Sequence, residues 1–188
     1  MPERLRIIGV DPGSIRCGYG VIELRETELR VVDYGVIEVR RGVEAVGARL
    51  HFIFTHLQAI LARTVPQEAA IESLFYARNA QSLAKLAQAR GVAVLALACA
   101  GLPIAEYAPR QIKQAVVGHG NATKEQVRYM VRVLLGLEET PRLYDATDAL
   151  AVALCHSFRR LQPATWGTPR TWKEFIERFP ERVVSAAP

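Results

Sequence analysis

The stretch Leu5–Gly13 reads LRIIGVDPG and decides the fold, because it places an acid directly at the end of an apolar strand. The apolar run up to Val10 is typical of a buried strand, and Pro12 with the following glycine ends it. An isolated ionised carboxylate is costly to bury unless positive charge meets it. Asp11 is therefore either the cap of a tight turn or the first member of a charged site, and the motif alone favours the turn.

Further patterns after this run predict a mixed sheet with helices on its faces. The first three strands are expected to pair as an antiparallel meander. The predicted strands are Leu5–Asp11, Gly18–Leu24, Leu29–Val39, Glu68–Glu72 and Ile104–Ala108. The predicted helices are Val43–Thr64, Asn79–Ala100, Arg110–Val117, Thr123–Gly136 and Asp145–Arg160. This order is typical of a ribonuclease-H-like α/β fold with a mixed five-stranded sheet flanked by helices.

Length and composition indicate a single domain. A chain of 188 residues can form one buried core, which we place at residues 1–160, followed by a C-terminal tail at 161–188 that contains Trp166 and Trp172. The longest apolar stretch, Gly91–Ile104, is too short and too interrupted for a membrane span, and no signal peptide precedes Asp11. We therefore expect a soluble, cytoplasmic protein. Three scattered cysteines indicate neither a disulfide framework nor structural zinc.

Basic residues concentrate in the middle of the chain. Between Ser73 and Leu137 the net charge is +6, whereas the whole chain carries +5. Clustered lysine and arginine bind polyanions by releasing phosphate counterions, but a solvated helical face has the same composition. Charge alone leaves both explanations open. The basic residues of this tract are Arg78, Lys85, Arg90, Arg110, Lys113, Lys124, Arg128 and Arg132.

Four acids in otherwise apolar surroundings are the candidate catalytic residues. Asp11 and Glu72 end predicted strands. Asp145 and Asp148 lie three residues apart and share one face of the last helix. Each has a structural alternative, since Asp145 suits a helix N-cap, Asp148 the first helical turn and Glu72 a solvated strand end. If the two strands are neighbours, however, all four carboxylates converge on one site.

Convergence of four carboxylates requires cations. Two unit charges about 4 Å apart repel by roughly 4 kcal/mol at an effective dielectric constant near 20. Oxygen ligands without a suitable thiolate or histidine cluster favour Mg²⁺, or Mn²⁺ as a substitute, over Zn²⁺. Two such ions about 4 Å apart would activate water and stabilise the leaving oxygen of a phosphodiester. The acids and the basic tract together predict metal-dependent hydrolysis of nucleic acid.

Two further features suit a nucleic-acid enzyme. Gly18 and Gly20, soon after the first acid, would let a phosphate or a metal ion approach the backbone closely. Phe75 and Tyr76 lie near an arginine, and such clusters form platforms on which bases stack. Core packing is the alternative for these aromatic residues, more so for one of them than for both.

Five segments, taken in order, resemble the RuvC family of Holliday junction resolvases. Their combination is highly specific and extends from Ile8 to about His156, although the first motif alone is weak. Thr147 departs from the alanine that family members often have, and the tail carries no family motif. The segments are Ile8–Ser14 with Gly18–Gly20, Ala70–Ala80, Lys85–Ala93, Glu106–Gln114 and Asp145–Ala151.

The resemblance implies a homodimer that binds four-way DNA junctions and makes symmetric paired nicks during recombination and DNA repair. It also implies the branch-migration proteins RuvA and RuvB as partners. The family's Mg²⁺-binding catalytic positions fall on Asp11, Glu72, Asp145 and Asp148. The candidate DNA-binding residues are Phe75, which would lie against junction bases, and the basic residues Arg78, Arg110, Lys113 and Lys124.

Three rival functions share parts of this pattern. Actin-like ATPases and sugar kinases also begin with a strand, an aspartate and glycines, but they need two related lobes and this chain has one. A ribonuclease acting on structured RNA would have the same fold, and comparing RNA with junction DNA as substrate distinguishes it. A junction-binding module without catalytic activity is disfavoured because all four acids are present.

Overall fold

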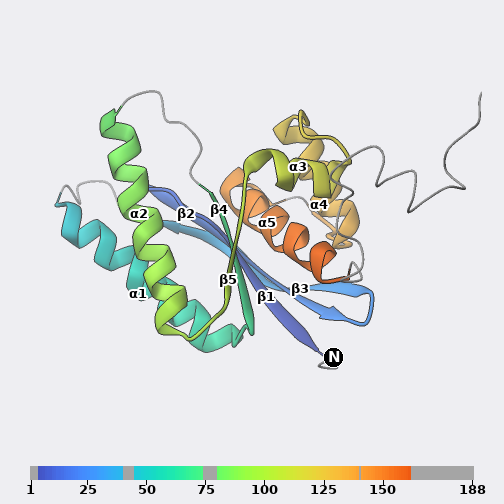
Figure 1. Cartoon of the computed structure of the whole chain (residues 1–188), viewed down its shortest axis with the longest axis horizontal. Helices are drawn as coiled ribbons and strands as arrows, with labels where there is room; N and C mark the ends of the chain where they lie inside the picture. Colours follow the sequence, from blue (N-terminus) through green and yellow to red (C-terminus); the bar gives the residue numbers. More distant parts are fainter. Residues whose placement is uncertain (1–3, 40–44, 74–79, 140, 162–188) are drawn as a thin grey trace, which may run out of the picture.

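The computed structural model describes residues 4–39, 45–73, 80–139 and 141–161. In chain order its elements are β1 (Leu5–Asp11), β2 (Arg16–Arg25), β3 (Glu28–Glu38), α1 (Val46–Thr64), β4 (Glu68–Glu72), α2 (Ala80–Cys99), β5 (Ile104–Tyr107), α3 (Pro109–Val117), α4 (Lys124–Leu134) and α5 (Tyr144–Leu161). The strands form one sheet in the order β3-β2-β1-β4-β5 (Figure 1). The β1–β2 and β2–β3 pairs are antiparallel, whereas the β1–β4 and β4–β5 pairs are parallel. The predicted mixed five-stranded sheet is confirmed, with bounds that differ by a few residues.

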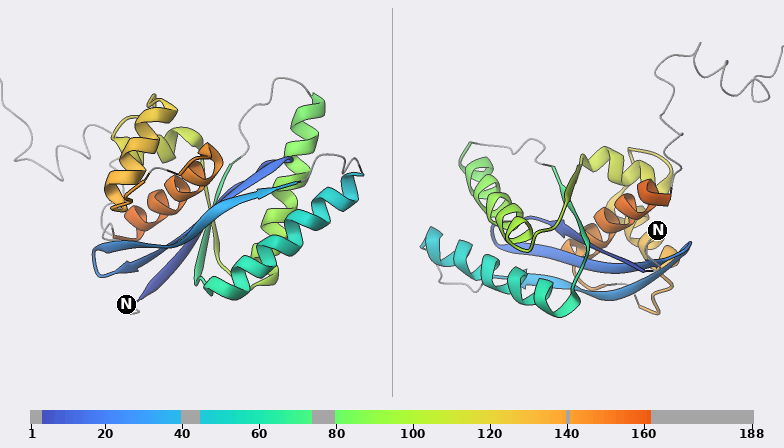
Figure 2. Two further views of the ribbon diagram at one scale, coloured as in Figure 1. Left: turned by 180° about the vertical axis from the view of Figure 1, so that it is seen from behind. Right: turned by 60° about the horizontal axis from the view of Figure 1, so that its bottom comes forward.

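Helices cover both faces of the sheet. Helices α1 and α2 lie on one face and α3, α4 and α5 on the other, as the two views of Figure 2 show. Each face has its own core because side chains alternate along each strand. Ile7 of β1 packs with residues of α3, α4 and α5, whereas Ile8 and Val10 pack with residues of α1 and α2. Because β1 and β4 are covered on both faces, their side chains can form an accessible site only at the strand ends.

Helix α5 lies directly on the backbone of β1 and β2. A Cβ atom at Gly18 would be 2.0 Å from the carbonyl oxygen of Asp145, and one at Gly9 would be 2.2 Å from that of Ala149. A Cβ atom at Gly20 would meet the same helix at 2.7 Å. The expectation that Gly18 and Gly20 leave room for a phosphate or metal ion is therefore wrong, because the backbone and side chains of α5 occupy that space.

Helix α2 exposes much apolar surface. Within the described ranges it is the one helix long and apolar enough to cross a membrane, with a mean hydropathy of 1.3 and only 22% of that window buried. One such helix is weak evidence for a membrane span, and α2 packs against α1 on the sheet. Leu83 and Leu95 are 39% and 54% exposed. An exposed apolar face of this kind favours contact with another protein surface.

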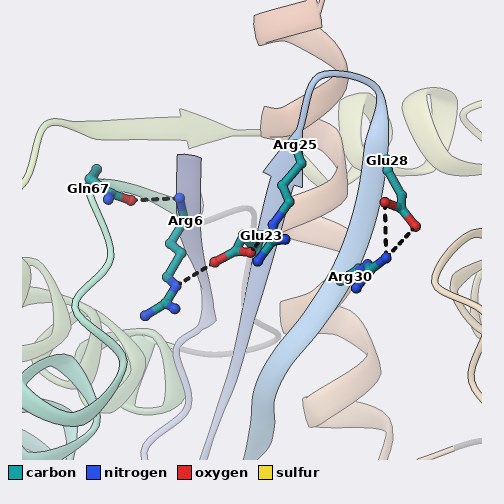
Figure 3. A network of polar contacts seen from close by, with 6 residues as sticks. All are labelled: Arg6, Glu23, Arg25, Glu28, Arg30 and Gln67. Atoms are coloured by element: carbon teal, nitrogen blue, oxygen red, sulfur yellow. Dashed lines mark hydrogen bonds and ion pairs between the residues drawn. The ribbon is translucent and has the colours of Figure 1, made fainter. Parts of the chain in front are cut away.

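A buried glutamate joins β1 and β2 at one end of the sheet (Figure 3). Glu23 accepts hydrogen bonds from Nε of Arg6 at 2.9 Å and from Nε of Arg25 at 2.6 Å. Arg6 also donates from Nη1 to the carbonyl oxygen of Thr64 at 2.8 Å, and its backbone N–H donates to Oε1 of Gln67 at 2.6 Å. The hydrogen bond from Arg6, followed by that from Arg25, holds the pKa of Glu23 below its usual value.

Replacing Glu23→Gln should lower the free energy of unfolding by about 1–3 kcal/mol at neutral pH, because it weakens two charge-assisted hydrogen bonds at a buried position. The pKa of Glu23 is lower in the folded chain than in the unfolded chain. Its contribution is therefore complete above the usual glutamate pKa and is lost as the pH falls through the folded value. In urea unfolding experiments, the difference in the free energy of unfolding between wild type and Glu23→Gln should shrink as the pH falls from about 7 to about 3.

The exposed pair between Glu28 and Arg30, also visible in Figure 3, supplies a matched control. Both side chains are 60% exposed. Glu28→Gln should therefore change the free energy of unfolding by less than about 1 kcal/mol. A loss at Glu23 that stays constant with pH would contradict the ionic explanation.

Candidate active site

Two of the predicted catalytic acids lie side by side at one edge of the sheet. Asp11 is the last residue of β1 and Glu72 is the last residue of β4. These strands are parallel neighbours, with Val10 paired to Ile71, so both acids emerge at the same edge. By strand alternation, both point to the side of the sheet that α5 covers. The two acid-bearing strands are therefore neighbours, as convergence of the four carboxylates requires.

A pocket of about 190 Å³ lies between this edge and helices α3, α4 and α5. Asp11 and Glu72 line it from the sheet, and Asp148 lines it from α5. Lys113 of α3 and Lys124 of α4 also line it, so acidic and basic groups face the same space. The rest of the lining is apolar and was not identified from the sequence, and it consists of Ile112, Val127, Ala151 and Val152.

Asp145 lies next to this pocket and is not among its lining residues. Its backbone carbonyl faces Gly18 of β2, and its charge acts on Asp11 and Asp148. Thr147, between the two helix acids, is 1% exposed, and its Oγ1 has no hydrogen-bond partner among the described residues. The side chain of Thr147 therefore points into the core, and having threonine at this position does not alter the face of α5 that carries the acids.

Burial and repulsion raise the pKa values of the acids in the pocket. Burial, followed by the charges of Glu72 and Asp148, raises the pKa of Asp11 to about 9. Burial is also the largest cause of the raised pKa of Glu72 and of the raised pKa of Asp148. Asp11 and Glu72 are close enough for each to affect the pKa of the other. Without a cation, this pair therefore keeps a proton that two separate carboxylates would have lost.

Two lysines counter part of this negative charge. Nζ of Lys124 is 3.4 Å from Oδ2 of Asp148, and the charge of Asp148 raises the pKa of Lys124. The charge of Lys113 favours the ionised forms of Glu72 and Asp148 and so offsets part of the increase in their pKa values. Burial outweighs these attractions, so the acids remain under-neutralised. The pocket can therefore accept additional positive charge.

The donor set fits a hard divalent cation. The acidic groups offer only oxygen ligands, which Mg²⁺ and Mn²⁺ prefer. A bound cation would also supply the charge that the raised pKa values show to be lacking. Across the described ranges, no group of three or more His, Cys, Asp or Glu side chains is already arranged as a metal site. The carboxylates would therefore have to turn toward an ion on binding it.

A hydrogen-bonded chain fixes α5 to β4 and β5. Nδ1 of His156 is 2.7 Å from the hydroxyl of Tyr107, and its Nε2 is 2.7 Å from Oε2 of Glu68. Arg160 adds a second contact to Glu68 at 3.1 Å. Tyr107 is in turn the β5 partner of Glu72. The chain therefore ties the helix that carries two acids to the strand that carries a third.

The candidate DNA-binding residues have different positions. Lys113 and Lys124 line the pocket, whereas Arg110 is exposed at the start of α3 and touches the loop after that helix. Phe75 and Arg78 lie outside the described residues, as do Trp166 and Trp172 of the tail. The structure therefore places two of the five candidate DNA-binding residues in the same pocket as the acids.

Comparison with known proteins identifies relatives over most of the chain. The family model described as crossover junction endodeoxyribonuclease RuvC matches residues 7–156. A crossover junction endodeoxyribonuclease RuvC of Heliobacterium modesticaldum is 48% identical over 163 residues, which cover 86% of this chain and 96% of that protein. Such identity over nearly the whole relative supports a common architecture and common chemistry.

Solved structures agree with this match. Thermus thermophilus RuvC, in a complex with a Holliday junction substrate, has a TM-score of 0.78 and 35% identity, and the match covers 84% of this chain and 95% of that one. The yeast mitochondrial Holliday junction resolvase Ydc2 has a TM-score of 0.62 and 9% identity, with 93% of this chain and 86% of that one covered, and shares the fold. The predicted ribonuclease-H-like fold is confirmed.

Proposed function

Because the chain belongs to the RuvC family of crossover junction endodeoxyribonucleases, we propose that it resolves four-way DNA junctions by phosphodiester hydrolysis at this pocket. The observation that carries the proposal is the convergence of three acids beside two lysines in one pocket. Carboxylates hold metal ions and lysines attract phosphate, which are the two requirements of a metal-dependent nuclease. We also propose, from the family relationship, that the nicks are paired and symmetric and serve recombination and DNA repair.

The chain's own residues would hold the cations and the scissile phosphate. Lys113 and Lys124 lie where they can attract a phosphate oxygen, while the neighbouring Ile112 and Val127 limit the access of water. Bound divalent ions would supply an activated water molecule and stabilise the leaving oxygen. We propose Mg²⁺, with Mn²⁺ as a substitute, and two ions per site. The proposed catalytic and metal-binding residues are Asp11, Glu72, Asp145 and Asp148.

Chain connectivity supports further DNA contacts near the pocket. Phe75 and Arg78 follow Glu72 by three and six residues, and an extended chain spans at most about 3.6 Å per residue. We propose that Phe75 stacks on junction bases and that Arg78 and Arg110, with the two pocket lysines, contact the DNA backbone.

We further propose that the enzyme is a homodimer. Two symmetric nicks require two active sites, and the exposed apolar face of α2 with Leu83 and Leu95 supports contact with a second copy. The family model ends at residue 156, which supports residues 1–160 as the catalytic domain and residues 161–188 as a separate tail. From the family relationship we also propose RuvA and RuvB as partners and a cytoplasmic location.

One assay tests this function against its rivals. Purified protein is incubated with a synthetic four-way junction, a duplex of the same sequence and an RNA hairpin, each with Mg²⁺ or with a chelator. Metal-dependent paired nicks confined to the junction are expected. Cleavage of the RNA hairpin in preference to the junction would favour a ribonuclease, and junction binding without any cleavage would favour a binding module.

Junction affinity should fall steeply as the salt concentration rises. The basic tract between Ser73 and Leu137 carries a net charge of +6, and each phosphate contact lowers log affinity by about 0.9 per tenfold rise in salt. Fluorescence anisotropy with a labelled junction in chelator measures this slope without cleavage. A flat titration would contradict the assignment of the basic tract to DNA binding.

A further inference from the structure

A second hollow lies beside the catalytic pocket, on the outer side of α4. It has a volume of about 300 Å³ and is formed by α4 and the first residue of α5. It combines two tyrosine rings with two arginine side chains, whereas the catalytic pocket combines acids with lysines. The residues of this α4 hollow are Glu125, Arg128, Tyr129, Arg132 and Tyr144.

The hollow forms because α4 buries only one of its faces. Val127 and Val131 are 5% and 0% exposed in the core, whereas Tyr129 is 60% exposed. Lys124, Arg128 and Arg132 follow at four-residue intervals and therefore lie along one side of the helix. The eight steps from Lys124 to Arg132 rise about 12 Å along the helix, which equals the axial rise of roughly three to four nucleotides of one DNA strand. The basic side of α4 thus matches the spacing of several phosphates.

Lys124 lines the catalytic pocket and also lies near Tyr144 of the hollow. Its Nζ is 3.4 Å from Oδ2 of Asp148 and 5.8 Å from the ring centroid of Tyr144. The guanidinium of Arg128 is 4.9 Å from the same ring. Tyr144 directly precedes Asp145 in α5. DNA with one phosphate at the catalytic pocket can therefore continue across the α4 hollow.

Within the hollow, Tyr129 and Arg132 are the groups available to a ligand. Arg128 is half-buried and donates from Nη2 to the carbonyl oxygen of Pro141 at 2.7 Å, so it holds the chain before α5. Glu125 places a negative charge near the start of α4 and would repel a phosphate there. The exposed side chain of Arg132 has no ion pair or hydrogen bond with the described residues. An anion is therefore expected to bind at the end of the α4 hollow that is lined by Arg132.

We propose that the α4 hollow is a second DNA-binding site, which holds the junction arm that continues from the cleaved strand. Arg132 contacts a backbone phosphate of that arm, and the ring of Tyr129 packs against the adjacent sugar or base. This assignment rests on the proposed junction-resolving function and adds to it a site that increases affinity for the arm. It uses no catalytic residue, so its loss should weaken binding and leave the chemical step intact.

The test compares Arg132→Gln and Tyr129→Ala with the matched control Arg30→Gln. Arg30 is also exposed, and by strand pairing it lies near Arg6, at the other end of β1 from Asp11. Junction affinity is measured by anisotropy in chelator at several salt concentrations. Arg132→Gln should lower the salt slope by about 0.9 and weaken binding severalfold, and Tyr129→Ala should weaken binding by about fivefold or more. Arg30→Gln should change neither quantity.

Three further measurements separate a loss at this site from unfolding and from failure of the proposed function. Tyr129→Phe keeps the ring and should restore wild-type affinity, and thermal unfolding shows whether each variant is folded. Single-turnover cleavage at saturating enzyme should proceed at the wild-type rate in both hollow variants. If Arg132→Gln and Tyr129→Ala are folded and have wild-type junction affinity and wild-type salt slopes, the α4 hollow is not a DNA-binding site. Junction cleavage by the wild-type protein would still support the proposed function in that case.

Discussion

Asp11→Asn should abolish junction cleavage and leave junction binding almost unchanged. Asp11 is the acid with the most acidic neighbours in the pocket, so its replacement removes the central candidate ligand for a cation. Loss of several kcal/mol of transition-state stabilisation corresponds to a rate decrease of about a thousandfold or more. The basic residues that attract DNA are untouched. Single-turnover cleavage with Mg²⁺ and anisotropy in chelator measure the two properties separately.

Stability provides the control for this variant. Burial and neighbouring acids raise the pKa of Asp11 above that of an unfolded chain, so its ionised form opposes folding at neutral pH. In chelator, Asp11→Asn should therefore be as stable as wild type or more stable, and Mg²⁺ should stabilise wild type more than the variant. Parallel loss of binding and cleavage, or a lower melting temperature in chelator, would contradict the division of roles.

Gly18→Ala should reduce both stability and cleavage, although it adds only a methyl group and leaves all four acids in place. The new Cβ would lie 2.0 Å from the backbone oxygen of Asp145, so the first turn of α5 has to move. Overpacking of this kind costs about 1–3 kcal/mol of stability or more. A displacement of about 1 Å at catalytic groups can lower the rate by about a hundredfold. Urea unfolding and single-turnover cleavage are the measurements.

Gly47→Ala is the matched control, because no atom lies within 4 Å of a Cβ atom at that position of α1. It should leave cleavage unchanged and should not destabilise the fold, since alanine has the higher helix propensity. Wild-type cleavage by Gly18→Ala would show that the close approach of α5 to β2 is not required to place its acids.

Most of the secondary structure was predictable from local patterns. A continuous apolar run located β1 and alternation of apolar residues located β2 and β3, while Thr123 with Gln126 forms the capping box that begins α4. The four acids could also be proposed, because each stands at the end of a strand or the start of a helix. Local patterns do not identify neighbours in space, however. The hydrogen-bonded chain of Tyr107, His156 and Glu68 joins residues 49 and 88 positions apart, and no spacing in the sequence reveals it.

The sequence by itself determined the acid at the end of the first strand, the other three acids, the basic tract and the resemblance that connects them. Only the tertiary structure decided what surrounds them. It placed Asp11 beside Glu72, put Asp145 outside the lining of the pocket, and gave the space at Gly18 and Gly20 to α5. The physical reason is that periodicity encodes which side of an element is buried, whereas strand order and helix packing decide which residue it meets.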